Sequence, residues 1–168
     1  MKLFRLLALA AAIATIASAA PALVLIVRHA EREAVPADDP PLTAAGRRRA
    51  EELVRVVRAW SATGVTVRAL FASEVKRTHE TLEPLAAAIG MTISTVAAKD
   101  TAALLRRILA VDGGIVVVAG HSNTVPAIAQ ALGGPTGIAL ADAEFDRLFA
   151  VTGVGAHAEV ISLRYGAR

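Results

Sequence analysis

The chain has 168 residues, of which 55% are hydrophobic and 20% charged, so it can bury one apolar core and lacks the composition of a disordered protein. It contains no cysteine, which excludes disulfides, thiolate metal sites and a cysteine nucleophile. The net charge of +3 would suit a nucleic-acid ligand, but Lys2 and Arg5 supply two of these charges from within a candidate export signal. Only four Phe, one Trp and one Tyr are present to stack on bases, so no nucleic-acid partner is expected.

The start of the chain has the pattern of a secretory signal peptide. Two basic residues precede an apolar run, and small residues follow it before Pro21. A membrane anchor is the alternative, because no charge separates Arg5 from Arg28. Pro21 and the use of residues 23–27 as a buried strand argue against that anchor. We therefore expect no stable membrane anchor and a periplasmic or secreted product, with a signal peptide at 1–20 and one domain at 21–168.

The rest of the chain alternates between short aliphatic segments, typical of buried strands, and apolar stripes at helical spacing. In chain order the pattern predicts a strand at 23–27, a helix at 50–60, a strand at 67–72, helices at 82–89 and 101–110, a strand at 115–119, a helix at 124–132 and a strand at 158–164. This alternation predicts an α/β fold, a three-layer α/β/α sandwich with a mostly parallel central sheet. Ligands of such sheets bind beyond the carboxyl ends of the strands.

Polar residues follow three of the predicted strands at the points where they end. Arg28 and His29 follow the first strand, Arg77 lies in the segment after the second, and His121 follows the third. Because the carboxyl ends of parallel strands meet at one edge, we expect two histidines and two arginines to converge there beside a helix N-terminus. The natural occupant of such a cationic pocket is a phosphoryl group.

Four short motifs, in this order along the chain, resemble those of the histidine phosphatase superfamily, also called the phosphoglycerate mutase-like superfamily. R-H-A-E at 28–31 is similar to its R-H-G tripeptide, with Ala30 in place of the usual glycine. The resemblance covers nearly all of residues 23–133, and the export signal suggests a small exported bacterial branch. The other three motifs are Leu42-Thr43-x-x-Gly46, Ser73-x-x-x-Arg77-Thr78 and G-H-S-N at 120–123.

This resemblance implies a phosphoglycerate mutase-like fold and a phosphomonoester hydrolase. His29 would attack phosphorus and form a phosphohistidine intermediate that water then hydrolyses. A neutral imidazole is nucleophilic near neutral pH, which suits His29 for this role in a chain without cysteine. No metal or cofactor would be required. The groups implied to hold the phosphoryl oxygens are Arg28, Arg77, His121, Ser122 and Asn123.

The proton donor for the leaving oxygen has three candidates. Asp100 is favoured, because members of this family often bring their acid in from the same region. Glu31, two residues after His29, is the second choice, and Glu74 is the third. Asp100 also fits a helix N-cap, and Glu31 also fits a residue that orients Arg28 or a histidine.

The remaining histidines and the basic run on the first helix are assigned no role in the site. His79 is expected on the solvent side of its helix, and His157 lies in a glycine-rich turn before the last strand. Arg47, Arg48 and Arg49 are expected to form a solvated face.

Three other functions are weighed against the hydrolase. A phosphate- or phosphoprotein-binding module would keep the cationic groups but lack turnover. A phosphoglycerate mutase-type phosphotransferase is disfavoured by the short segment between Arg77 and His121. A metal site made of His29, Glu31 and His121 would place two arginines beside a cation. The admissible substrates of the hydrolase are a phosphorylated small molecule, an envelope sugar phosphate and a phosphoprotein.

Overall fold

The computed structural model describes residues 20–154 and 157–166. The predicted signal peptide therefore lies outside the described residues, apart from Ala20. The helices are α1 (Ala44–Ser61), α2 (Lys76–Ile89), α3 (Thr101–Leu109) and α4 (Thr124–Ala131). The strands are β1 (Leu23–Arg28), β2 (Val67–Ala72), β3 (Ile93–Thr95), β4 (Ile115–Gly120), β5 (Arg147–Thr152) and β6 (Glu159–Arg164).

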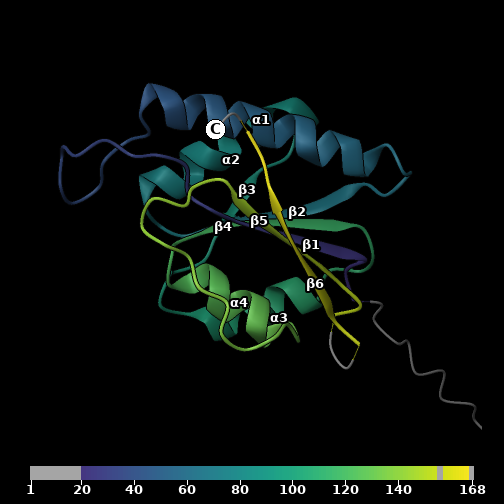
Figure 1. Ribbon diagram of the computed structural model, residues 1–168. Helices are drawn as coiled ribbons and strands as arrows, with labels where there is room; N and C mark the ends of the chain where they lie inside the picture. The colour runs from purple at the N-terminus through teal and green to yellow at the C-terminus, as the bar shows by residue number, and fades with distance from the viewer. Residues whose placement is uncertain (1–19, 155–156, 167–168) are drawn as a thin grey trace, which may run out of the picture.

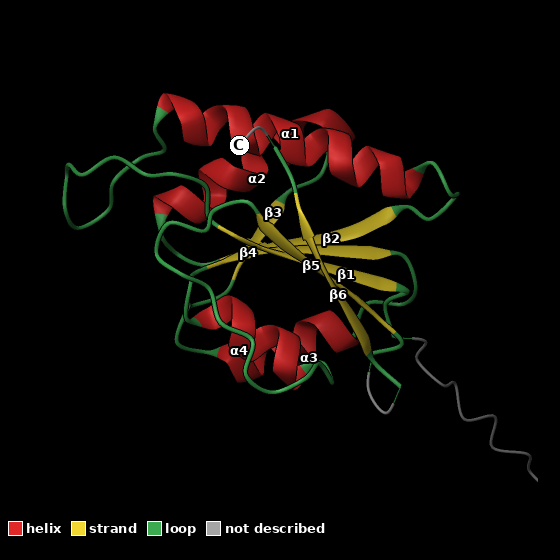
Figure 2. Cartoon of the chain, viewed as in Figure 1, coloured by secondary structure: helices red, strands yellow, loops and turns green. Residues whose placement is uncertain are grey.

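The elements form three layers, with α1 and α2 on one face of a central sheet and α3 and α4 on the other (Figures 1 and 2). The sheet has six strands in the order β3-β2-β4-β1-β5-β6. Strands β3, β2, β4 and β1 are parallel to one another, whereas β5 runs antiparallel to both β1 and β6. The predicted α/β/α sandwich with a mostly parallel sheet is thus confirmed. Within the described residues, no helix is long and apolar enough to span a bilayer.

Strand β1 shows why the sheet is buried on both faces. Leu25 and Val27 pack among the side chains of α1 and α2, while Val24 and Ile26 pack among those of α3 and α4, and none of these four is exposed to solvent. Burying one such side chain stabilises the fold by about 1.5–3 kcal/mol. The central strands are therefore fixed rigidly, and so are the residues that follow their carboxyl ends.

Local signals fix the helix ends. The Thr43 side chain caps α1 by accepting a hydrogen bond from Gly46 N, and Gly90 ends α2 with a left-handed φ of 66°. All four predicted helices and all four predicted strands are present. The sequence analysis missed β3 and β5, and β5 is central because it pairs with both β1 and β6.

Candidate active site

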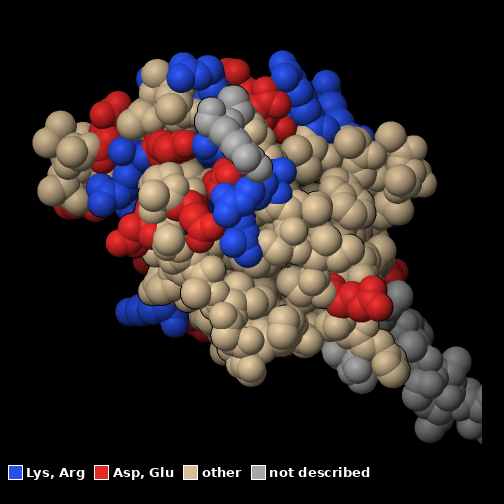
Figure 3. Space-filling model, viewed as in Figure 1, with Lys and Arg blue, Asp and Glu red and all other residues tan. Residues whose placement is uncertain are grey.

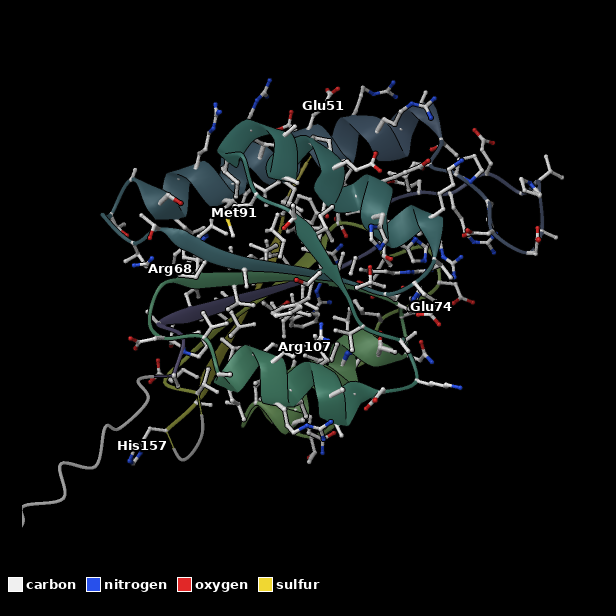
Figure 4. The ribbon with its side chains drawn as sticks, turned by 180° about the vertical axis from the view of Figure 1, so that it is seen from behind. Glu51, Arg68, Glu74, Met91, Arg107 and His157 are labelled. Atoms are coloured by element: carbon white, nitrogen blue, oxygen red, sulfur yellow. The ribbon has the colours of Figure 1, made fainter. Side chains whose placement is uncertain are left out.

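The register of the parallel strands brings the two predicted histidines together. Arg28 at the end of β1 pairs with Gly120 at the end of β4, and the His29 amide continues the ladder by donating to Gly120 O at 2.8 Å. Ala72 at the end of β2 pairs with Ala119, so the loop after β2 begins at the same edge. In Figure 4, Glu74 marks this edge and His157 lies at the opposite end of the molecule.

His29 is buried, with 4% of its surface exposed, and its tautomer is fixed by its own backbone. Its Nδ1 lies 2.8 Å from the carbonyl oxygen of Ala30. Since a carbonyl only accepts, Nδ1 carries the proton, and the lone pair of the neutral ring is on Nε2. Burial and then the charges of Arg77 and Arg28 lower the pKa of His29 to about 4. The hydrogen bond to Ala30 opposes this shift, because it favours the charged form of the ring. At neutral pH the ring is therefore uncharged.

Ala30, which replaces the glycine of the R-H-G tripeptide, fits without backbone strain. Among the described residues, no amino acid other than glycine has a positive φ, so the chain does not require glycine here. The Ala30 methyl packs with Leu42 and Ala50, and its amide donates to Thr81 Oγ1 at 2.9 Å. These contacts anchor the loop directly after the nucleophile.

His121 lies beside His29, with ring centroids 5.4 Å apart, and a chain of hydroxyl groups orients it. Its Nε2 is 2.9 Å from Ser73 Oγ, which is 2.9 Å from Thr78 Oγ1. The Thr78 hydroxyl donates to the carbonyl of Val75 at 2.8 Å. Ser73 must therefore donate to Thr78 and can accept from His121, which leaves Nδ1 of His121 as the nitrogen available to a ligand. Burial and then the Arg77 charge lower the pKa of His121.

Gly120 allows the Thr124 side chain to pack closely against the end of β4. The Thr124 hydroxyl accepts a hydrogen bond from His121 N at 2.8 Å, and a Cβ on residue 120 would lie 2.8 Å from that same oxygen. Ser122 and Asn123 form the turn between His121 and α4, with Asn123 at the N-cap position but without a capping bond from its side chain. Their backbone thus lies beside the second imidazole, at a helix N-terminus.

The two predicted arginines both have an unused donor. Arg28 donates through Nη1 to the carbonyls of Ala141 and Asp142 at 3.0 and 2.8 Å, and its guanidinium lies 4.2 Å from the centre of the Phe145 ring. Arg77 is the second residue of α2. Within the described residues, the buried Nε atoms of Arg28 and Arg77 have no hydrogen-bond partner. Burial is the main reason that the pKa of each arginine is lowered. An anionic ligand near these guanidinium groups would offset the cost of burying their charge.

Glu31 is engaged in an ion pair. Both of its carboxylate oxygens accept hydrogen bonds from Arg49, the shortest at 2.7 Å, and Arg49 also donates to Tyr165 O at 2.8 Å. Burial raises the pKa of Glu31, but the bonds and charge of Arg49 outweigh this and leave it lowered. Arg49 is therefore a half-buried structural residue, and the expectation that the whole 47–49 run is a solvated face is wrong at this position.

The other two acid candidates lie in solvent. Asp100 is exposed and caps α3, accepting a hydrogen bond from Ala103 N at 2.8 Å. Glu74 accepts one from Ala98 N at 2.7 Å, and backbone hydrogen bonds lower the pKa of its carboxyl. Of the two, only Glu74 has a charge that acts on His121, raising the pKa of that imidazole.

The sequence analysis missed two residues at this edge, Arg32 and Phe145. The Phe145 ring centre lies 5.8 Å from that of His29, between the nucleophile and the loop that holds Arg28. The positive charge of Arg32 lowers the pKa of both Arg28 and Arg77. Arg32 directly follows the R-H-A-E motif, so its position was a usable signal, whereas nothing in the sequence around Phe145 pointed to the site.

The family model of the histidine phosphatase superfamily (branch 1) matches residues 24–98. This range contains three of the four motifs, and the fourth supplies His121 at the same edge of the sheet. Over this range the chain matches the histidine phosphatase superfamily. No curated protein matches it significantly.

Solved structures of histidine phosphatase type share its fold at low identity. The protein histidine phosphatase SixA, solved with tungstate, is 17% identical, with a TM-score of 0.64 over 84% of this chain and 96% of that one. A mycobacterial glucosyl-3-phosphoglycerate phosphatase, solved with inorganic phosphate, is 13% identical, with a TM-score of 0.62 over 86% and 97%. A phosphoserine phosphatase mutant from Entamoeba histolytica, solved with phosphoserine, is 12% identical, with a TM-score of 0.58 over 85% and 95%.

The site is cationic and built from imidazole and guanidinium groups. In the parts of the chain that the structure describes, no three His, Asp or Glu side chains are grouped so that they could hold a metal ion. Glu31, the carboxylate of the metal-site alternative, is held by Arg49 instead. The arrangement can bind a tetrahedral anion and present an uncharged nitrogen nucleophile to it.

Proposed function

We propose that the protein is a phosphomonoester hydrolase that acts through a phosphohistidine intermediate on His29, after export and removal of residues 1–20. One observation carries the chemistry: the His29 and His121 rings lie 5.4 Å apart, and the positive charges of Arg28 and Arg77 act on both of them. A phosphoryl group bound beside the neutral His29 ring would offset these charges and the cost of burying them.

In the first step, the Nε2 lone pair of His29 attacks phosphorus, and the bond from phosphorus to the ester oxygen breaks with its electrons on that oxygen. Arg28 and Arg77 neutralise charge on the phosphoryl oxygens, which is the main requirement of an in-line transfer. In the second step, water attacks phosphorus, the P–N bond breaks, and orthophosphate leaves with His29 again neutral.

His121 would respond to the substrate. Without a ligand its lowered pKa keeps the ring neutral. A phosphate dianion beside it favours the charged form, so the ring takes up a proton and donates it as a hydrogen bond from Nδ1. The bond from Nε2 to Ser73 holds the ring in the required orientation while this happens.

The comparisons support the phosphoryl group as the common part of the substrate. The similar structures carry tungstate, inorganic phosphate and phosphoserine, and tungstate is a tetrahedral oxyanion like phosphate. The rest of the substrate differs among these proteins. A phosphorylated small molecule, an envelope sugar phosphate and a phosphoprotein all remain compatible with this proposal.

The test is turnover of p-nitrophenyl phosphate with and without EDTA by the purified protein and by His29→Ala. We expect EDTA-resistant turnover by the wild type, none by His29→Ala, and unchanged turnover by His79→Ala, a control histidine on the surface of α2. Acid-labile, base-stable phosphate on the rapidly quenched wild-type protein would identify the phosphohistidine. Turnover by a folded His29→Ala protein would refute the nucleophile.

The same assay separates the alternatives. Phosphate binding without hydrolysis at any pH would support the binding module. Transfer of the phosphoryl group to an added alcohol in preference to water would support a phosphotransferase. Loss of turnover with EDTA would support a metal site.

A further inference from the structure

The space around the site limits where the rest of a substrate can lie. A crevice beside Ser73 and His121 has a volume of only about 20 Å³, which is room for one water. On the other side, Arg28 lines an open cleft of about 620 Å³, a size typical of small-ligand sites. Arg28 directly precedes His29, and the Phe145 ring, which also lines the cleft, lies 5.8 Å from the His29 ring. The body of a substrate whose phosphoryl group is at His29 can therefore extend into this larger cleft.

Arg32 stands on a wall of the cleft at a well-anchored position. It forms an antiparallel bridge with Leu42, and the next residue, Glu33, donates its amide to Pro41 O at 2.8 Å. The two ends of the protruding loop 32–41 are therefore joined at its base (Figure 1). Asp39 in the same loop accepts a hydrogen bond from Lys76 N at the start of α2, next to Arg77.

The charge of Arg32 is not used by the protein itself. Among the carboxylates of the described residues, none forms an ion pair with its guanidinium, which donates only to the backbone oxygen of Glu33 at 3.3 Å. Two carboxylates, those of Glu33 and Asp142, also line the cleft. The side of the molecule from which this loop protrudes thus carries both basic and acidic side chains (Figure 3).

Phe145, Ala34 and Ala37 supply the apolar part of the lining. We propose that Arg32 binds a second anionic group of the substrate, so that the cleft selects phosphomonoesters with a carboxylate or a further phosphate near the phosphoryl group. This inference rests on the proposed function for the place of the phosphoryl group. A guanidinium can pair with two oxygens of such a group at once.

Two matched pairs of compounds test the proposal, because each differs only in one carboxylate. Phosphoserine is compared with phosphoethanolamine, and phosphotyrosine with phosphotyramine as the longer pair. The ammonium group is common to both members, so Glu33 and Asp142 affect them equally. Calorimetry on His29→Ala measures binding without turnover, and competition with p-nitrophenyl phosphate measures the same preference in protein with His29 intact.

We expect at least one pair to show about tenfold tighter binding of the carboxylated member. Arg32→Gln should reduce this preference to about one, Arg32→Lys should retain part of it, and Arg48→Gln, which removes an exposed arginine from α1, should leave it unchanged. Equal binding of both members in both pairs, or a preference that survives Arg32→Gln, would overturn the proposal.

The two proposals fail separately. An Arg32-dependent preference in a protein that hydrolyses no phosphomonoester would leave the second-anion site standing and remove the hydrolase. Hydrolysis through His29 with no such preference would leave the hydrolase standing and remove the role of Arg32. A bisphosphate without a carboxylate separates the two sources of the anion, because Arg32→Gln should weaken its binding only if a second phosphate serves as well as a carboxylate.

Discussion

The buried neutral state of His29 predicts a specific loss of stability in acid. Its pKa in the folded protein is about 4, against 6.5 for an ordinary histidine. Above pH 6.5 the ring is neutral in both folded and unfolded chains. As the pH falls from 6.5 to 4 only the unfolded chain takes up the proton, so the free energy of unfolding decreases.

The size of the effect follows from the shift. Below pH 4 the free energy of unfolding is lower by about 3.4 kcal/mol, because ~1.36 kcal/mol is lost for each pH unit between the two pKa values. Between pH 7 and pH 5 the loss is about 2 kcal/mol. Asn at position 29 does not titrate, so His29→Asn should lose about 2 kcal/mol less than the wild type over this interval. His121, whose pKa is also lowered, is present in both proteins.

Urea unfolding at pH 7 and pH 5 measures this difference. The control is His79→Asn, which removes an imidazole from α2 without changing the surroundings of His29. Equal losses in His29→Asn and the wild type would show that His29 is not a buried neutral base. The derivation of its nucleophilic form would then fail, whatever the activity of the variants.

Three further predictions concern the architecture of the site and its chemistry. Gly46→Ala should destabilise the protein by about 1–3 kcal/mol in urea unfolding, because the new Cβ would clash with the backbone oxygen of Glu31. As a control, Ala45→Gly on the exposed side of α1 should cost at most about 1 kcal/mol. Ser73→Ala should lower kcat more than it raises KM for p-nitrophenyl phosphate, by about tenfold, because His121 loses its orienting bond; an unchanged kcat would contradict this. Turnover of aryl phosphates should rise steeply as the pKa of the phenol falls, and a flat dependence would show that a protein group protonates the leaving oxygen.

Much of the fold was predictable because the parallel strands carry their own signal. Segments such as 115–119 are aliphatic throughout, as strands buried on both faces must be. Strand β5 was missed although Gly153 follows it directly, because the charged residues Glu144, Asp146 and Arg147 stand before its short apolar run at 148–151. It forms because β1 and β6 pair with it on both sides, which is a tertiary effect that no local pattern reports.

The cationic part of the site was predictable for a related reason. His29 and His121 each follow a strand directly, so the order of elements places them at one edge without knowledge of any side chain. Arg49 was misassigned because helical spacing says which face of α1 it is on but not what covers that face. Its partners, Glu31 and the carbonyl of Tyr165, lie far away in the sequence on either side of it.

The order of residues gave least guidance on which group protonates the leaving oxygen, and the surroundings of the three candidate carboxyls explain why. In the described part of the chain, the pKa values of Glu31 and Glu74 are both lowered, so neither carboxyl is protonated at neutral pH, and Asp100 is engaged at the N-terminus of α3. A carboxyl stays protonated when it is buried without a compensating cation, whereas the positive charges at this edge of the sheet favour the carboxylate form. The positive charges that would attract a phosphoryl group therefore also keep the nearby carboxyls deprotonated. We expect a phosphatase with such a site to favour leaving groups that depart without a proton, such as aryl oxides and protonated nitrogen, over simple alkoxides.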